Sequence, residues 1–127
     1  MSIDPIKAAV GSSRWILELA PDWDGEGSQS YDRAVWERAT NFVLTHAKAL
    51  WQKFGWHMDA PRISPGPKGS IDVHWKNPRF ELLINFPPGP NEMATFYGDN
   101  YGKIVIKGTL DPKKKNREVL EWLAQPV

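Results

Sequence analysis

The chain has 127 residues, of which 41% are hydrophobic and 24% charged, and its formal net charge is +1. These values are typical of a single globular domain spanning residues 1–127, which would bury ~two-thirds of the surface of its unfolded chain. They exclude an intrinsically disordered chain and a nucleic-acid binder that depends on bulk positive charge. Seven tryptophans are many for this length and are expected to divide between the core and an interface.

The absence of cysteine excludes disulfide bonds, thiolate metal sites and cysteine nucleophiles. The N-terminus carries no apolar signal segment, and no run of residues approaches the ~18 apolar positions of a membrane span. We therefore expect a soluble, cytoplasmic protein with no membrane partner.

A first helix is predicted from Asp4-Pro5, because proline is well tolerated at an early helical position. Gly11-Ser12-Ser13 weakens it, so the regular helix begins either at Asp4 or only after Ser12 or Ser13. Ala20-Pro21 ends it, since the residue before proline disfavours the helical conformation.

The strongest helical periodicity covers Tyr31 to Phe54, with Ser30 as the expected N-cap and Asp32 in the first turn. Its apolar stripe includes His46, for which we expect a core or boundary position. Gly55 follows and is expected to end the helix.

From Ala60 onward the apolar residues alternate with polar ones, which is typical of strands. Turn-forming residues separate the predicted strands, which cover 62–64, 71–76, 80–86, 93–97 and 103–107. The first of these is short, and a final helix is predicted from Asp111 to Leu123. The sequence thus predicts an α+β fold with two N-terminal helices, an antiparallel meander of about four strands, and a C-terminal helix. The helices are expected to pack on one face of the sheet.

An acidic glycine loop lies between the two N-terminal helices and contains Asp22, Trp23, Asp24, Gly25, Glu26 and Gly27. Alternating carboxylates before a glycine partly imitate a calcium loop, but Arg33 occupies the position of the essential bidentate glutamate. We predict a structural loop without metal. Trp23 would fill a gap between the helices and the sheet, Asp24 would accept backbone N–H groups, and the glycines would adopt positive φ. The alternative is a metal-dependent enzyme centred on this loop.

Two motifs resemble those of a set of small bacterial and phage proteins. They are the loop Pro21-x-Trp23-Asp24-Gly25-x-Gly27 and the later pair Pro61-x-Ile63-x-Pro65 and Ile71-x-Val73-x-Trp75. The similarity covers about residues 15 to 108, with departures at Glu26 and Ser28. This family has no established activity, so the resemblance implies the order of elements and an accessory protein of a bacterium or phage. It transfers no catalytic residue.

No catalytic constellation is predicted. His46, His57 and His74 share no metal-ligand spacing, and no nucleophile elbow accompanies them. We therefore expect a non-enzymatic protein without a cofactor.

A basic run follows the last strand and contains Lys113, Lys114, Lys115 and Arg117. At the start of the final helix these cations would oppose the helix dipole, which favours contact with phosphate or with an acidic protein. The alternative function is accordingly a nucleic-acid or nucleotide-binding module.

The remaining candidate residues lie on exposed faces. His74, Lys76 and Tyr97 belong to the predicted polar face of the sheet, while Trp36 and Trp51 lie off the main stripe of the long helix and would be interface residues if exposed. The function predicted from these features is binding of another protein, as an inhibitor or neutraliser of the antitoxin, immunity or anti-defence type.

Overall fold

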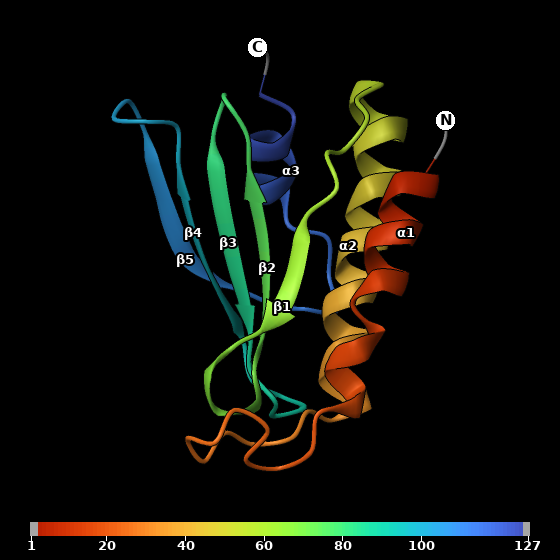
Figure 1. Cartoon of the computed structure of the whole chain (residues 1–127). Helices are drawn as coiled ribbons and strands as arrows, with labels where there is room; N and C mark the ends of the chain where they lie inside the picture. The colour runs from red at the N-terminus through yellow and green to blue at the C-terminus, as the bar shows by residue number, and fades with distance from the viewer. Residues whose placement is uncertain (1–2, 126–127) are drawn as a thin grey trace.

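The computed structural model describes residues 3–125 and contains one five-stranded antiparallel sheet with strand order β1-β2-β3-β4-β5 (Figure 1). Its strands are β1 Arg62–Pro65, β2 Ile71–Lys76, β3 Glu81–Phe86, β4 Ala94–Asp99 and β5 Val105–Leu110. Each strand pairs with its neighbour in sequence, as a meander does.

Helices cover one face of this sheet and leave the other open (Figure 1). They are α1 Asp4–Ser12, α2 Arg33–Phe54 and α3 Arg117–Leu123, with short 3₁₀ turns η1 Arg14–Glu18 and η2 Pro67–Gly69. None of the helices in the described part of the chain combines the length and the apolar composition needed to traverse a bilayer. The predicted α+β class is confirmed.

The sheet has five strands rather than about four. The short segment β1 pairs with β2 over its whole length, and Ile63 lies opposite Val73. Both side chains are buried, so apolar packing as well as backbone pairing holds this short strand in place.

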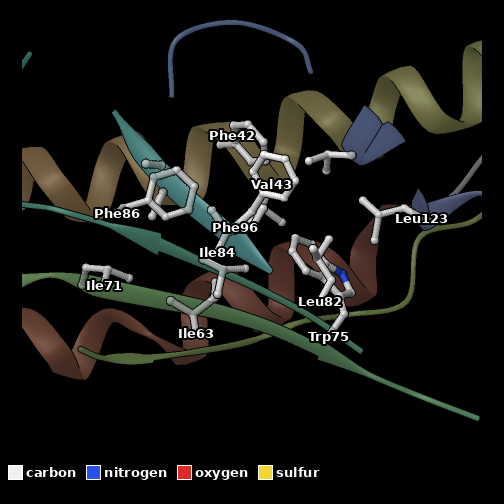
Figure 2. Packing of buried hydrophobic residues seen from close by; sticks show 14 of the residues in the cluster. Phe42, Val43, Ile63, Ile71, Trp75, Leu82, Ile84, Phe86, Phe96 and Leu123 are labelled. Atoms are coloured by element: carbon white, nitrogen blue, oxygen red, sulfur yellow. The ribbon is translucent and has the colours of Figure 1, made fainter. Parts of the chain in front are cut away.

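The core forms between α2 and the inner face of the sheet (Figure 2). The alternation predicted from the sequence is confirmed, since every second residue of β2 and β3 is buried: Ile71, Val73, Trp75, Leu82, Ile84 and Phe86. Phe42 of α2 meets Phe86 edge-on at a centroid distance of 5.4 Å. The geometry is one that aromatic pairs prefer.

The first helix breaks at Ser13, within the weak segment that the sequence indicated. Ser13 Oγ donates to Val10 O over 2.6 Å and accepts the indole N–H of Trp36 over 2.9 Å. The side chain thereby links the end of α1 to α2. The alternative that the helix begins only after Ser12 or Ser13 is wrong, because α1 starts at Asp4.

The long helix begins two residues later than predicted. Asp32, not Ser30, occupies the N-cap position, and its side chain makes no capping hydrogen bond. Tyr31 is instead extended toward the sheet, where its buried hydroxyl donates to Gly66 O over 2.8 Å. Tertiary burial of Tyr31 therefore decides where the helix starts. The predicted end at Gly55 is confirmed, with φ +64°.

The C-terminal helix is shorter than predicted because residues 111–115 form a turn. Asp111 Oδ1 accepts the Lys113 N–H over 2.9 Å, and the Lys114 N–H donates to Asp111 O. Asn116 then caps α3, its side-chain oxygen accepting the Val119 N–H. The prediction that Lys113, Lys114 and Lys115 oppose the dipole of this helix is wrong, since all three precede it.

Gly98 offers a direct test of the packing between the sheet and α3. A Cβ at this position would lie 2.9 Å from both Ile106 Cγ1 and Trp122 Cε2. We expect Gly98→Ala to lower the free energy of unfolding by about 1–3 kcal/mol in urea denaturation, because the core must shift to admit the methyl group.

Gly11→Ala is the matched control for that substitution. Gly11 lies in α1, and a Cβ there would meet nothing within 4 Å. This variant is expected to raise the free energy of unfolding by about 0.5–1 kcal/mol. Equal stabilisation by both alanines would contradict the described contact between Gly98 and Trp122.

Candidate interaction surfaces

The open face of the sheet is assembled from cross-strand rows. One row runs from His74 through Leu83 and Tyr97 to Lys107, each residue paired with the next. Beside it, Asp72, Asn85, Thr95 and Thr109 form a second row by the same pairing. Side chains of these two rows line a hollow on β3–β5. The structure therefore brings Tyr97 and His74 onto one face, as the sequence predicted.

Polar contacts fix the β2 side of this face. His74 Nε2 lies 2.7 Å from Glu81 Oε1. Asn85 Nδ2 donates to Asp72 Oδ1 and to Ser70 Oγ, each over 2.8 Å. These side chains are already engaged within the chain. The binding residue predicted at His74 is thus partnered, while Lys76, at the end of the same strand, is exposed.

Toward the other edge the open face becomes apolar. Leu83, Tyr97 and Val105 have 39%, 49% and 50% of their surface exposed. Leu83 lies directly opposite Tyr97, and Val105 lies diagonal to Tyr97 on the next strand. We call these three residues the apolar patch.

Strand β5 adds a free backbone edge to this patch. The Asn100 N–H donates to Ile104 O over 3.1 Å, and residues 98 and 106 continue the same pairing. Hydrogen-bonded and non-bonded pairs alternate in an antiparallel ladder, so Val105, Lys107 and Thr109 point their backbone groups away from β4. β5 ends the strand order, so these groups face outward.

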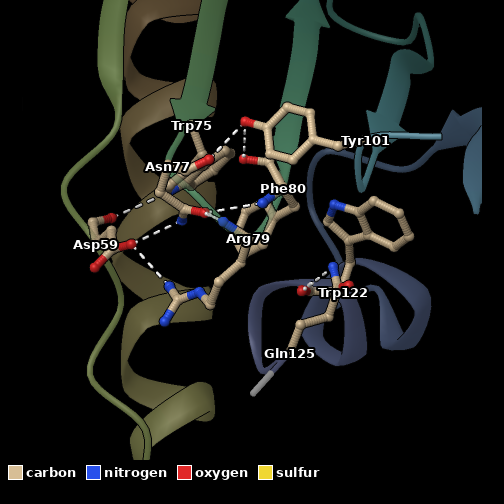
Figure 3. A network of polar contacts seen from close by, with 8 residues as sticks. All are labelled: Asp59, Trp75, Asn77, Arg79, Phe80, Tyr101, Trp122 and Gln125. Atoms are coloured by element: carbon tan, nitrogen blue, oxygen red, sulfur yellow. Dashed lines mark hydrogen bonds and ion pairs between the residues drawn. The ribbon is translucent and has the colours of Figure 1, made fainter. Parts of the chain in front are cut away.

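A polar network braces the end of the sheet beside the patch (Figure 3). Asp59 Oδ2 accepts from Asn77 Nδ2 over 2.8 Å and from Arg79 over 2.9 Å, and its backbone oxygen accepts the Trp75 indole N–H. From the β4–β5 turn, the Tyr101 hydroxyl donates to Asn77 O. The β4–β5 turn beside the patch is thus tied to the β2–β3 turn.

The two tryptophans proposed on the long helix differ in outcome. Trp36 is 6% exposed and packs beneath Ser13, with the Arg14 guanidinium over its ring. It is not an interface residue, because α1 and η1 cover that side of α2. Trp51 is partly exposed and lies against the ring of His57. Its role in binding stays a prediction.

The acidic loop satisfies its own hydrogen bonds. Asp24 accepts the Glu26 N–H over 2.9 Å and also bonds the Ser28 hydroxyl, while Asp22 Oδ1 accepts the Gly27 N–H. The Ser28 and Glu26 bonds hold the pKa of Asp24 below its ordinary value. Gly25 and Gly27 adopt φ of +73° and +82°, as predicted. Asp22 also adopts positive φ, which the sequence did not predict.

One part of the predicted loop is wrong. Trp23 does not fill a gap between the helices and the sheet, because 39% of its surface is exposed. Its indole N–H closes the loop instead, donating to Gln29 O over 3.2 Å. No cluster of three or more His, Cys, Asp or Glu side chains suited to a metal ion occurs among residues 3–125.

Asp24→Ala should loosen this loop, because the backbone N–H of Glu26 loses its acceptor. We expect faster cleavage within residues 22–29 in limited proteolysis, read by mass spectrometry. Glu26→Ala is the control, since that residue contributes its backbone N–H. Protection of the wild-type loop by millimolar calcium would contradict a purely structural loop.

The basic run is held against α2 by His46. His46 Nδ1 donates to Phe42 O over 2.8 Å, and Nε2 accepts the Asn116 N–H over 3.0 Å. The Asn116 N–H can only donate, so this imidazole is neutral. Burial, with a smaller contribution from the Lys115 charge, lowers the pKa of His46 from 6.5 to about 4. The predicted core position of His46 is confirmed.

The burial of neutral His46 makes stability depend on pH in a defined window. Below about pH 6.5 the unfolded chain protonates His46 while the folded chain does not, so stability is lost as pH falls from 6.5 to 4. The loss contributed by His46 is about 3 kcal/mol in urea denaturation. His46→Gln should remove this component, and an unchanged pH dependence in the variant would contradict the assignment.

Two hollows lie one after the other along α2, between this helix and the segment around Asn116. The first is lined by Arg38, Asn41, Phe42, Thr45, His46, Pro112, Lys113 and Lys114. The second is lined by Ala49, Gln52, Lys53, Lys115, Arg117 and Leu120. We call the two hollows together the basic groove.

Several surface residues escaped the sequence reasoning. Leu83 and Val105 lie in the predicted strands 80–86 and 103–107, but alternation within one strand does not show that they adjoin Tyr97. Register with β4 would have identified both. Arg38 and Lys53 lie far from the basic run in sequence, so spacing carried no signal for them.

No family model, curated protein or solved structure matches this chain. The resemblance to small bacterial and phage proteins stays a prediction. The apolar patch and the basic groove are therefore the features that bear on function.

Proposed function

We propose that this protein binds another protein through the apolar patch and the adjoining edge of β5, and acts as an inhibitor or neutraliser without catalysis. The observation that carries the proposal is the uneven distribution of exposed apolar surface. Six of the nine large exposed hydrophobic residues found among residues 3–125 come from β3–β5 and their connections: Leu83, Met93, Tyr97, Tyr101, Ile104 and Val105. Of these, Leu83, Tyr97 and Val105 adjoin one another on the open face, and contiguous exposure of this kind is typical of an interaction surface.

The chemistry of this surface defines the partner. Tyr97 offers a large, half-exposed aromatic ring of a residue type that is enriched in interface hot spots, and it lies beside aliphatic Leu83. Lys107 adjoins Tyr97 in the same row and favours an acidic side chain on the partner. The outward backbone groups of β5 can pair with an extended segment of that partner. We infer a partner that contributes a strand with an apolar and an acidic position.

The inhibitory role rests on two further considerations. Two sequence motifs resemble those of small bacterial and phage proteins without an established activity, and neutralising a toxin or a defence component is a role that fits an accessory protein of this origin. The sheet face is also braced before any partner arrives, by the Asp59–Asn77–Arg79 contacts at its end. A surface held in place in advance loses little conformational entropy on binding.

The test is affinity capture from nuclease-treated bacterial lysate, read by quantitative mass spectrometry. We expect a stoichiometric protein on the wild type that is lost with the double variant Leu83→Ala/Tyr97→Ala. It should also be lost with Lys107→Pro, which blocks the outward edge without removing a bond to β4.

Trp15→Ala is the matched control for these variants. Trp15 on η1 is 48% exposed, close to the value for Tyr97, but lies outside β3–β5. Capture should survive this substitution. A partner retained equally by all variants would place the interface elsewhere, and turnover of a substrate by the purified protein would overturn the non-enzymatic role.

A further inference from the structure

The basic groove draws its cations from two distant parts of the sequence. Arg38 and Lys53 come from α2, whereas Lys113, Lys114 and Lys115 come from the turn that follows β5. Arg38 and Lys53 are 15 residues apart on α2, which corresponds to ~22 Å along the helix axis. Figure 1 shows the chain after β5 crossing to α2 before α3 begins. Two segments thus place positive charge at two neighbouring hollows along α2.

Few carboxylates oppose these charges. Glu121 pairs with Arg117 over 2.8 Å, and Asp111 Oδ1 accepts the Lys113 backbone N–H. Neither hollow is lined by an acidic side chain. Lys53, Lys113, Lys114 and Lys115 form no ion pair with any residue that the structure describes. The lysines remain available for an external anion although the whole chain is nearly neutral.

The walls of the groove supply neutral hydrogen-bonding groups as well. Asn41 and Thr45 line the first hollow and lie on the same side of α2 as Arg38, seven residues apart from first to last. The Arg38 guanidinium donates through one nitrogen to the carbonyls of residues 87–89, at 2.8 to 3.3 Å. This contact holds the Arg38 side chain against the loop that follows β3, at the first hollow. Cations next to amide and hydroxyl groups are the usual partners of phosphate.

One exposed aromatic ring lies beside Lys53, which lines the second hollow. Phe54 is 43% exposed, and Lys53 Nζ lies 6.0 Å from the centre of its ring. A ring beside a phosphate-binding cation is the arrangement on which an unpaired base stacks. The two hollows lie between α2 and the segment that follows β5, whereas reading a duplex requires an element that enters its groove. This shape favours a single strand.

We propose that the basic groove binds the phosphates of a single nucleic-acid strand, independently of base sequence, with Phe54 stacking on a base at one end. This site is separate from the apolar patch, so either proposal can fail without the other. Lys113, Lys114 and Lys53 provide the phosphate contacts, and Asn41 and Thr45 bond phosphate oxygens.

The experiment is fluorescence anisotropy of the full chain with labelled single-stranded RNA and DNA of about 12 nucleotides. We expect binding at about 50 mM salt that weakens steeply as salt rises. Lys113→Ala/Lys114→Ala should reduce affinity about tenfold and lower the slope of log K against log salt by about 1.4, because two phosphate contacts are lost.

Lys76→Ala/Lys107→Ala is the matched control, since it removes the same charge from the sheet face. Its affinity and slope should stay at the wild-type values, and thermal melting should confirm that both double variants remain folded. Equal losses in the two variants, or no binding at about 50 mM salt, would overturn the proposal. Competition by inorganic phosphate or ATP, at a concentration equal to that of the phosphate groups in the labelled strand, would also overturn the proposal. The groove would then be a site for a small anion.

Discussion

One-sided burial is the constraint from which the rest of this structure follows. The long helix α2 packs its apolar stripe against the inner face of the sheet, and no element among residues 3–125 forms a layer on the outer face. The outer face therefore meets solvent or a partner, and the far side of α2 is left for the segments that precede and follow the sheet. Both candidate surfaces lie where this arrangement leaves the layers uncovered.

Much of this arrangement could be predicted because its signals are local. The alternation of apolar and polar residues from Ile71 to Phe86 predicted which side chains face the core, and Gly55 predicted the end of α2. The predictions that were wrong concern residues whose positions depend on contacts with distant parts of the chain. Trp36 lies off the stripe of α2 but is covered by Ser13, and Tyr31 leaves the helix to reach Gly66. No pattern within one segment encodes such partners.

The candidate sites divide in the same way. The predicted acceptor role of Asp24 in the acidic loop is confirmed, because it bonds groups within four residues. The three lysines of the basic run lie before α3 and not on it as predicted. Their segment is held by the bond between the Asn116 N–H and His46, which are 70 residues apart. Arg38 and Lys53 join that run only through the fold. The sequence thus predicted the basic run, whereas the α2 side of the groove could be found only from the fold.

The sequential strand order has a consequence for how the molecule assembles. Each strand pairs with its neighbour along the chain, so the sheet can grow hairpin by hairpin with little loop-closure entropy. The bond between Asn116 and His46 instead closes a long loop that encloses the whole sheet. Docking of the C-terminal segment onto α2 is then the late step of folding. Amide exchange should be slowest in β2–β4 and faster at Asn116, even though that N–H is bonded to a buried ring.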